Sequence, residues 1–127
     1  MRSGTEKRRI LAIDDDPAVR RILDQALSER YDVRILDSGA ELSRVLPHFR
    51  PELIILDVGL PWINGFDLCE DFRQNQAFAS TPILFLTGFV DAEHRERGVQ
   101  AGANSYLTKP FDMETLSREL NRLFQPA

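Results

Sequence analysis

The chain alternates between short apolar runs and longer segments in which apolar residues recur every three or four positions. The runs are RILAI, DVRIL, LIIL, PILFL and SYL, at 9–13, 32–36, 53–56, 82–86 and 105–107. We predict a strand at each of them, because short apolar runs bounded by polar residues are typical of strands. Three of the runs are almost wholly apolar, as in strands that helices cover on both faces. The pattern predicts an α/β fold, with a parallel sheet between layers of helices.

The segments between these runs have the periodicity of helices. Apolar residues recur at three- and four-residue steps in 19–27, 42–49 and 113–124. The segment 90–101 differs, because it is polar around most of its circumference and contains Gly98. A glycine costs a helix about 1 kcal/mol relative to alanine. We expect a weakly held helix there, either an ordinary solvated one or part of a mobile face.

Residues that favour helix ends agree with this periodicity. Asp16 is placed to cap a helix whose first turn contains Pro17, which is why we interpret it as a cap and not as a ligand. The segment Ser38–Glu41 has the spacing of a capping box, and Asp112 can cap the last helix. Gly102 is expected to end the fourth helix.

The length and charge of the chain limit its architecture and partners. With 127 residues, 43% of them hydrophobic, it suits one domain, which we place at 9–124 between tails at 1–8 and 125–127. The net charge is −4 and the basic residues are scattered, so direct binding of nucleic acid is not expected. No apolar run approaches the roughly 20 residues of a membrane span, and the N-terminus lacks the apolar stretch of a secretion signal. We expect a cytoplasmic protein.

Cysteine and histidine offer little chemistry in this sequence. Cys69 is alone, which excludes an internal disulfide, and its place in an apolar pattern predicts a small buried side chain. His48 and His94 lie in polar surroundings and have no partner at ligand spacing. We expect both histidines to face solvent.

Polar residues follow four of the predicted strands. Asp14 and Asp15 follow the first, Asp57 the third, Thr87 the fourth and Lys109 the fifth. In an open parallel sheet the carboxyl ends of the strands border one crevice, where ligands bind. Carboxylate oxygens suit a hard cation such as Mg²⁺, while lysine and threonine suit the oxygens of a phosphoryl group. The sequence therefore predicts a metal site at which a cation offsets the repulsion between three acids.

The pieces that carry these residues resemble the response-regulator receiver domains of two-component signalling, such as the chemotaxis regulators. They are ILAIDDDP (10–17), LIILDVGLP (53–61) leading to NG (64 and 65), PILFLTG (82–88) and AGANSYLTKPF (101–111). The resemblance runs from about Arg9 to Phe124. It implies a flavodoxin-like, doubly wound sheet with strand order 2-1-3-4-5 and five helices.

The resemblance also implies a phosphorylation mechanism. Asp57 would take a phosphoryl group from a histidine kinase or phosphotransfer protein. Asp15, Asp57 and the carbonyl of Gly59 would hold Mg²⁺ or Mn²⁺, with Asp14 acting mainly through water. The chain would be a signalling phosphoacceptor that promotes its own phosphorylation and dephosphorylation, and not an enzyme with a separate substrate.

A change of surface would be the output. Lys109 would pair with a phosphoryl oxygen, Thr87 would turn its hydroxyl toward the phosphate, and Tyr106 would rotate inward behind Thr87. This would remodel the face formed by the fourth helix, the fifth strand and the fifth helix, for a downstream protein or effector domain or for a second copy of the chain. The peptide bond between Lys109 and Pro110 would be cis.

Four residues depart from the family pattern. Gly59 and Phe89 each stand two positions after a site residue, and both flank the path of a hydrolytic water. We hypothesise that Phe89 shields the phosphoryl group and slows its loss. Gly88 replaces a more usual alanine, and Trp62 stands where glycine is usual. Because Trp62 is near Asp57 in the sequence, its fluorescence is expected to change on adding Mg²⁺ or beryllofluoride.

Three other functions are open to such a sequence. Asp14 and Asp16 have the D-x-D spacing of haloacid dehalogenase phosphohydrolases, but Ala18 stands where that family has threonine or valine. A flavodoxin-like cofactor binder would share the strand order, but three acids would repel a flavin phosphate. The third is an adaptor of the same fold that has lost phosphorylation, against which the complete set of site residues argues.

Overall fold

The computed structural model describes residues 6–60 and 63–125 of the chain. The strands are β1 (Arg9–Ile13), β2 (Asp32–Leu36), β3 (Leu53–Leu56), β4 (Ile83–Thr87) and β5 (Ser105–Thr108). The α-helices are α1 (Pro17–Leu27), α2 (Leu42–Phe49), α3 (Gly65–Gln74), α4 (Ala92–Ala101) and α5 (Met113–Phe124). None of the helices in these two ranges is long and apolar enough to cross a membrane.

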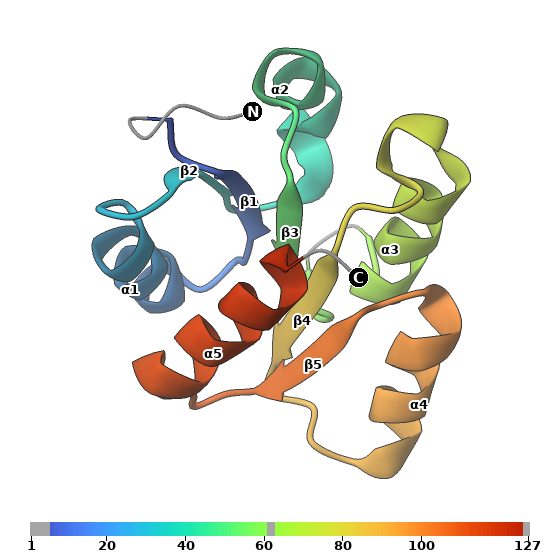
Figure 1. Cartoon of the computed structure of the whole chain (residues 1–127). Helices are drawn as coiled ribbons and strands as arrows, with labels where there is room; N and C mark the ends of the chain where they lie inside the picture. Colours follow the sequence, from blue (N-terminus) through green and yellow to red (C-terminus); the bar gives the residue numbers. More distant parts are fainter. Residues whose placement is uncertain (1–5, 61–62, 126–127) are drawn as a thin grey trace.

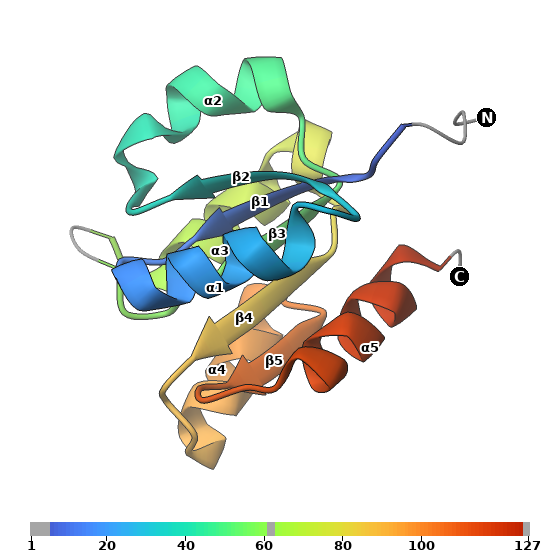
Figure 2. The same cartoon turned by 90° about the vertical axis from the view of Figure 1, so that its left-hand side faces the viewer.

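The five strands form one sheet in the order β2-β1-β3-β4-β5, and every neighbouring pair is parallel. Helices α1 and α5 cover one face of the sheet, and α2, α3 and α4 cover the other (Figures 1 and 2). The predicted fold class and strand order are confirmed. The predicted strands are confirmed as well, although β4 begins and ends one residue later than its apolar run and β5 ends one residue later.

The two helical layers explain why the central strands are apolar throughout. Leu11 and Ile13 of β1 belong to the core on the side of α2 and α3. Ile10 and Ala12 belong to the core on the side of α1 and α5. All four side chains are at most 1% exposed. Successive residues of a strand point to opposite faces, so a strand between two layers must be apolar at every position.

Most predicted helix ends are confirmed. Asp16 accepts a hydrogen bond from the backbone N–H of Ala18 at 2.9 Å, and Asp112 accepts one from Thr115 at 2.7 Å. Gly102 ends α4 with a φ of 102°, a left-handed conformation that glycine adopts without strain.

The capping box predicted for Ser38–Glu41 is wrong. Ser38 caps a short 3-10 helix, Gly39–Glu41, by accepting from the N–H of Ala40, and α2 begins only at Leu42. The carboxylate of Glu41 accepts instead from Arg44 at 2.8 Å. With its side chain directed along the helix, Glu41 does not complete the reciprocal bond that a capping box needs.

Gly98 has a packing role in α4. It is buried, and a Cβ added there would lie 3.1 Å from Cδ2 of Tyr106 and 3.5 Å from Cδ2 of Phe85. The glycine therefore gives α4 a close approach to β4 and β5, which offsets its poor helix propensity.

Arg73 of α3 fixes the loops at the end of the sheet opposite Asp14 and Asp57. Its guanidinium donates to the carbonyls of Phe78, Thr81 and Gly102 and to Oδ1 of Asn104, over 2.7–3.0 Å. Cys69, also on α3, donates to the carbonyl of Ala101 at 3.4 Å. Burial raises the pKa of this thiol to about 11, in agreement with its predicted inert role. These contacts join α3 to the C-terminal end of α4.

Candidate functional site

The sheet itself places the candidate residues. Its backbone hydrogen bonds continue one residue beyond three of the strands. The N–H of Asp14 donates to the carbonyl of Leu36 at 3.0 Å, that of Asp57 to the carbonyl of Ile13 at 3.1 Å, and that of Lys109 to the carbonyl of Thr87 at 2.8 Å. The three side chains therefore start from neighbouring points at the carboxyl edge of the sheet. This is the convergence predicted from the sequence.

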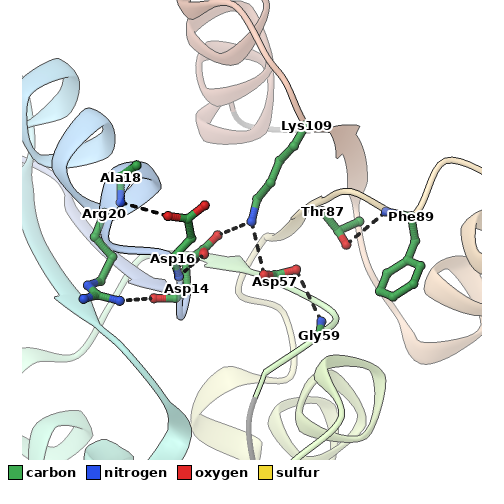
Figure 3. A network of polar contacts seen from close by, with 9 residues as sticks. All are labelled: Asp14, Asp16, Ala18, Arg20, Asp57, Gly59, Thr87, Phe89 and Lys109. Carbon is green, nitrogen blue, oxygen red and sulfur yellow. Dashed lines mark hydrogen bonds and ion pairs between the residues drawn. The ribbon is translucent and has the colours of Figure 1, made fainter.

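Lys109 joins two acids at the centre of the site. Its Nζ lies 2.7 Å from Oδ2 of Asp14 and 3.1 Å from Oδ2 of Asp57. Figure 3 shows the lysine reaching down between the two carboxylates. Asp14 is 2% exposed and Asp57 8% exposed, so both charges are largely removed from water. Taking these carboxylates out of water costs free energy, which Lys109 partly offsets by contacting both of them.

The pKa values of these groups show the cost of that arrangement. Burial raises the pKa of Asp14, although hydrogen bonds from Lys109 and from the N–H of Asp16 partly offset it. Burial also works against the charge of Lys109, but its contacts with Asp14 and Asp57 outweigh this and raise its pKa. Lys109 is therefore charged at neutral pH, and the ionised form of Asp14 is held at a cost to the fold.

The acids also fit a divalent cation. Asp14, Asp15 and Asp57 each offer a carboxylate oxygen, and these oxygens lie within 4.8 Å of one another. Two of the residues are buried and Asp15 is exposed, so the cluster opens to solvent on one side. Oxygen ligands of this kind suit Mg²⁺ or Mn²⁺. Asp16 lies outside the cluster, because its side chain caps α1 as predicted.

Thr87 and Gly59 lie on the Asp57 side of the site (Figure 3). Thr87 is fully buried, and its Oγ1 accepts from the N–H of Phe89 at 3.4 Å. The N–H of Gly59 donates to Oδ1 of Asp57 at 3.3 Å. Cε2 of Phe89 is 3.6 Å from the point that a Cβ on Gly59 would occupy, so the phenyl ring stands beside Gly59.

Tyr106 lies next to this group and not among the acids. Its hydroxyl donates to the carbonyl of Phe89 at 2.7 Å, and its ring lies 6.0 Å from that of Phe85. Burial raises the pKa of the phenol, so Tyr106 stays a neutral donor at physiological pH. Thr87 thus binds the backbone N–H of Phe89, and Tyr106 binds the backbone carbonyl of the same residue.

Two further predictions have different outcomes. The peptide bond between Lys109 and Pro110 is cis, as predicted. Trp62 lies outside the described residues, so its expected fluorescence response stays a prediction.

Sequence reasoning missed Arg20, whose Nη1 donates to the carbonyl of Asp14 at 3.0 Å and so steadies the loop that carries the acids. The sequence offered one indication of this role, which is that Arg20 lies in the first turn of the helix that Asp16 caps.

Mg²⁺ is expected to raise the melting temperature of the chain, because the acid cluster that would hold the ion exists only in the folded state. At a concentration a hundred times the Kd, the gain is about 2.7 kcal/mol. Asp14→Asn is expected to lose most of this gain, and to melt above the wild type without metal, since it removes a buried charge with a raised pKa. Calorimetry with and without Mg²⁺ measures both effects.

Asp71→Asn, at an exposed position of α3, is the matched control and should keep the full response. An equal response of the wild type and Asp14→Asn would contradict this assignment of the metal site.

Comparison with known proteins agrees with this geometry. The sequence model of the response regulator receiver domain matches residues 10–121. The transcriptional regulator RpaA of Synechocystis is 36% identical over 118 residues, 92% of this chain and 49% of RpaA. GltR of Pseudomonas aeruginosa is 38% identical over 121 residues, 94% of this chain and 50% of GltR. The chain thus spans about half the length of the curated relatives it matches.

Solved structures match over nearly their whole length. The chemotaxis response regulator CheY4 of Vibrio cholerae superposes with a TM-score of 0.86 at 32% identity, covering 93% of this chain and 99% of that one. The non-phosphorylated receiver domain of HemR from Leptospira biflexa gives 0.84 at 31% identity, covering 95% and 97%. Fold, acid cluster and sequence agree, and the chain belongs to the response regulator receiver domains of two-component systems.

Proposed function

We propose that this receiver domain, at 9–124, accepts a phosphoryl group on Asp57. The observation that carries the proposal is the contact of Nζ of Lys109 with both Asp14 and Asp57 beside a third carboxylate. A purely structural ion pair needs one acid. Here two acids contact the lysine and a third lies close to those two, so the site carries more negative charge than Lys109 balances and can attract a further cation.

The chemistry follows from these contacts. One carboxylate oxygen of Asp57 attacks phosphorus, the bond from phosphorus to the donor breaks, and the donor leaves with that electron pair. The ammonium of Lys109 offsets the charge of the phosphoryl oxygens, and the N–H of Gly59 helps to orient the carboxylate. Positioning and electrostatics of this kind supply most of the catalysis in phosphoryl transfer.

Asp15, Asp57 and the carbonyl of Gly59 would hold Mg²⁺ or Mn²⁺, with Asp14 acting mainly through water. When bound, the ion supplies positive charge that balances both the acids and the phosphoryl oxygens. The donor set supports this, since it consists of carboxylate oxygens with one side open to solvent.

Phosphorylation would change the surface through Phe89. If the hydroxyl of Thr87 turns to a phosphoryl oxygen, the N–H of Phe89 loses its acceptor. The carbonyl of the same residue is bonded to the hydroxyl of Tyr106, so the loop between β4 and α4 and the position of Tyr106 respond together. The face formed by α4, β5 and α5 would then contact a downstream target, an effector domain or a second copy.

A groove beside Lys109 supports a protein donor. It has a volume of about 360 Å³, and apart from Asp16 and Lys109 it is lined by apolar side chains of α1, of the segment before α5 and of the first residue of α5, including Val19, Ile22, Phe111 and Met113. Ile22 is 45% exposed, although it belongs to the apolar stripe of α1. An apolar surface next to the acceptor suits docking of a histidine kinase or phosphotransfer protein.

The direct test is incubation with a small acyl phosphate and Mg²⁺, followed by intact-mass measurement and peptide mapping. One phosphoryl group on the peptide that carries Asp57, absent when EDTA is added, is the expected result. A phosphorylation-independent adaptor would gain no mass. A phosphohydrolase that uses Asp14 would be labelled on a different peptide.

Phe89→Glu is expected to shorten the life of the phosphorylated form by about tenfold, because a charged, flexible side chain would replace the apolar ring beside Gly59 and admit water. The measurement is the loss of phosphoryl label after the donor is removed. Equal decay of Phe89→Glu and the wild type would mean that Phe89 is ordinary surface packing.

A further inference from the structure

The ring of Phe89 is held from the side of α4. His94, in the first turn of that helix, stacks on it with the ring centroids 4.4 Å apart and the planes within 9°. Near-parallel stacking at this distance is a favourable aromatic arrangement. Phe89 is 43% exposed, so this contact, and not burial in the core, determines where its ring lies.

His94 is itself fixed at its other edge. Its Nδ1 lies 2.7 Å and 2.8 Å from the two carboxylate oxygens of Asp91, and the backbone N–H of His94 donates to the same carboxylate at 3.2 Å. Asp91 is the N-cap of α4, so one carboxylate begins the helix and orients the imidazole. Phe66 is a second aromatic neighbour of the imidazole, with ring centroids 6.2 Å apart. The imidazole is therefore bonded to the N-cap of α4 at one edge and has two phenyl rings as neighbours.

We propose that His94 is a positioning residue that holds Phe89 beside Gly59 and so limits the access of water to phosphorylated Asp57. The inference rests on the proposed function, because it concerns the life of the phosphoryl group. It adds a residue that no site prediction contained, seven positions after Thr87 and on a different element from the acids.

The reaction that His94 would slow is hydrolysis. The oxygen of a water molecule attacks phosphorus and the bond from phosphorus to the Asp57 oxygen breaks. The carboxylate and inorganic phosphate are released, with the proton of the water passing to solvent. The water must approach on the side of phosphorus opposite the Asp57 oxygen. A ring standing beside Gly59 narrows this approach, and a ring free to rotate would not.

The test compares the decay of the phosphorylated chain for four proteins with Mg²⁺. His94→Ala removes the stacked ring and is expected to decay about fivefold faster than the wild type, the factor that one aromatic stack would supply. His94→Phe keeps a ring without the bond to Asp91, and is expected to restore slow decay. Gln100→Ala, at an exposed position on the same helix, is the control and should decay as the wild type does.

A second measurement separates positioning from a general loosening of α4. In the Phe89→Ala background there is no ring to hold, so adding His94→Ala should leave the decay rate unchanged. Full additivity of the two substitutions would overturn the proposal, as would equal decay of His94→Ala and the wild type. Circular dichroism melting of each variant verifies that all of them are folded under the assay conditions.

The first step of the assay separates this inference from the function on which it rests. If the wild type gains no phosphoryl group from the acyl phosphate, the proposed function fails, and the role of His94 fails with it. If all variants are phosphorylated but decay alike, only the role of His94 is overturned.

Discussion

Asp57→Asn is expected to reduce phosphorylation of the chain by an acyl phosphate at least about 1,000-fold, because the amide cannot act as the attacking carboxylate. The variant should remain folded. Its side-chain oxygen can accept from one of the two donors that Asp57 has in the wild type, Nζ of Lys109 or the N–H of Gly59, and Lys109 keeps its contact with Asp14. The substitution also removes one negative charge from the cluster of Asp14, Asp15 and Asp57. The expected signature is therefore full thermal stability with no phosphoryl label in intact-mass spectra.

The matched control is Asp16→Asn. It makes the same chemical change two positions from Asp14, at an exposed side chain that caps α1. Asparagine caps helices about as well as aspartate, so both phosphorylation and stability should be those of the wild type. Label that persists in Asp57→Asn would place the acceptor on another carboxylate, and peptide mapping would identify it.

Gly65→Ala is expected to destabilise the domain by about 3 kcal/mol, with a fall in melting temperature of about 10 °C. A Cβ at this position would lie 2.3 Å from the carbonyl oxygen of Asp57 and 2.7 Å from Cα of Val58. Both neighbours are backbone, so no side chain can turn away. The N–H of Gly65 also donates to the carbonyl of Val58 at 2.8 Å, which holds α3 against this loop.

Since the backbone that must move is that of Asp57, the same variant should also be phosphorylated more slowly than its stability alone explains. Gly88→Ala is the control, because a Cβ there would meet nothing within 4 Å. Its free energy of unfolding should stay within about 0.5 kcal/mol of the wild type. Thermal and urea unfolding of the three proteins measure the effect, and equal stability of Gly65→Ala and Gly88→Ala would contradict it.

The positions of the acids could be predicted because they depend on the sheet. Once 9–13 and 53–56 are taken as parallel strands, Asp14 and Asp57 must lie at the same edge, and the ladder of backbone hydrogen bonds fixes their spacing. Lys109 follows by the same reasoning from the last strand. No detail of side-chain packing was needed for these three residues.

The surroundings of Phe89 could not be predicted in this way. The position of the ring depends on the path of the loop between β4 and α4. The sequence of this loop has no hydrophobic periodicity from which that path could be predicted. The same holds for His94, which we expected to face solvent. His48 does, but His94 has a side chain only 35% exposed and stacks on Phe89. A partner five residues away across a helix cap gives no repeating pattern in the sequence.

Ser38 and Gly65 show two other limits. The spacing of Ser38 and Glu41 is compatible with a capping box, but Arg44 competes for the same carboxylate, and a motif match does not include such competition. The close approach at Gly65 involves the backbone of a distant strand end. Sequence alone marks such a glycine only as a turn residue.

The contacts of Arg73 and Cys69 make the two ends of α4 unequal. At the C-terminal end, side chains of α3 bind the carbonyls of Gly102 and Ala101, well away from the acids. At the N-terminal end, the bonds of Asp91 are exposed and local to the helix itself. We therefore expect α4 to pivot about its last turn when it reorients. The first turn, which carries His94, would then be displaced furthest.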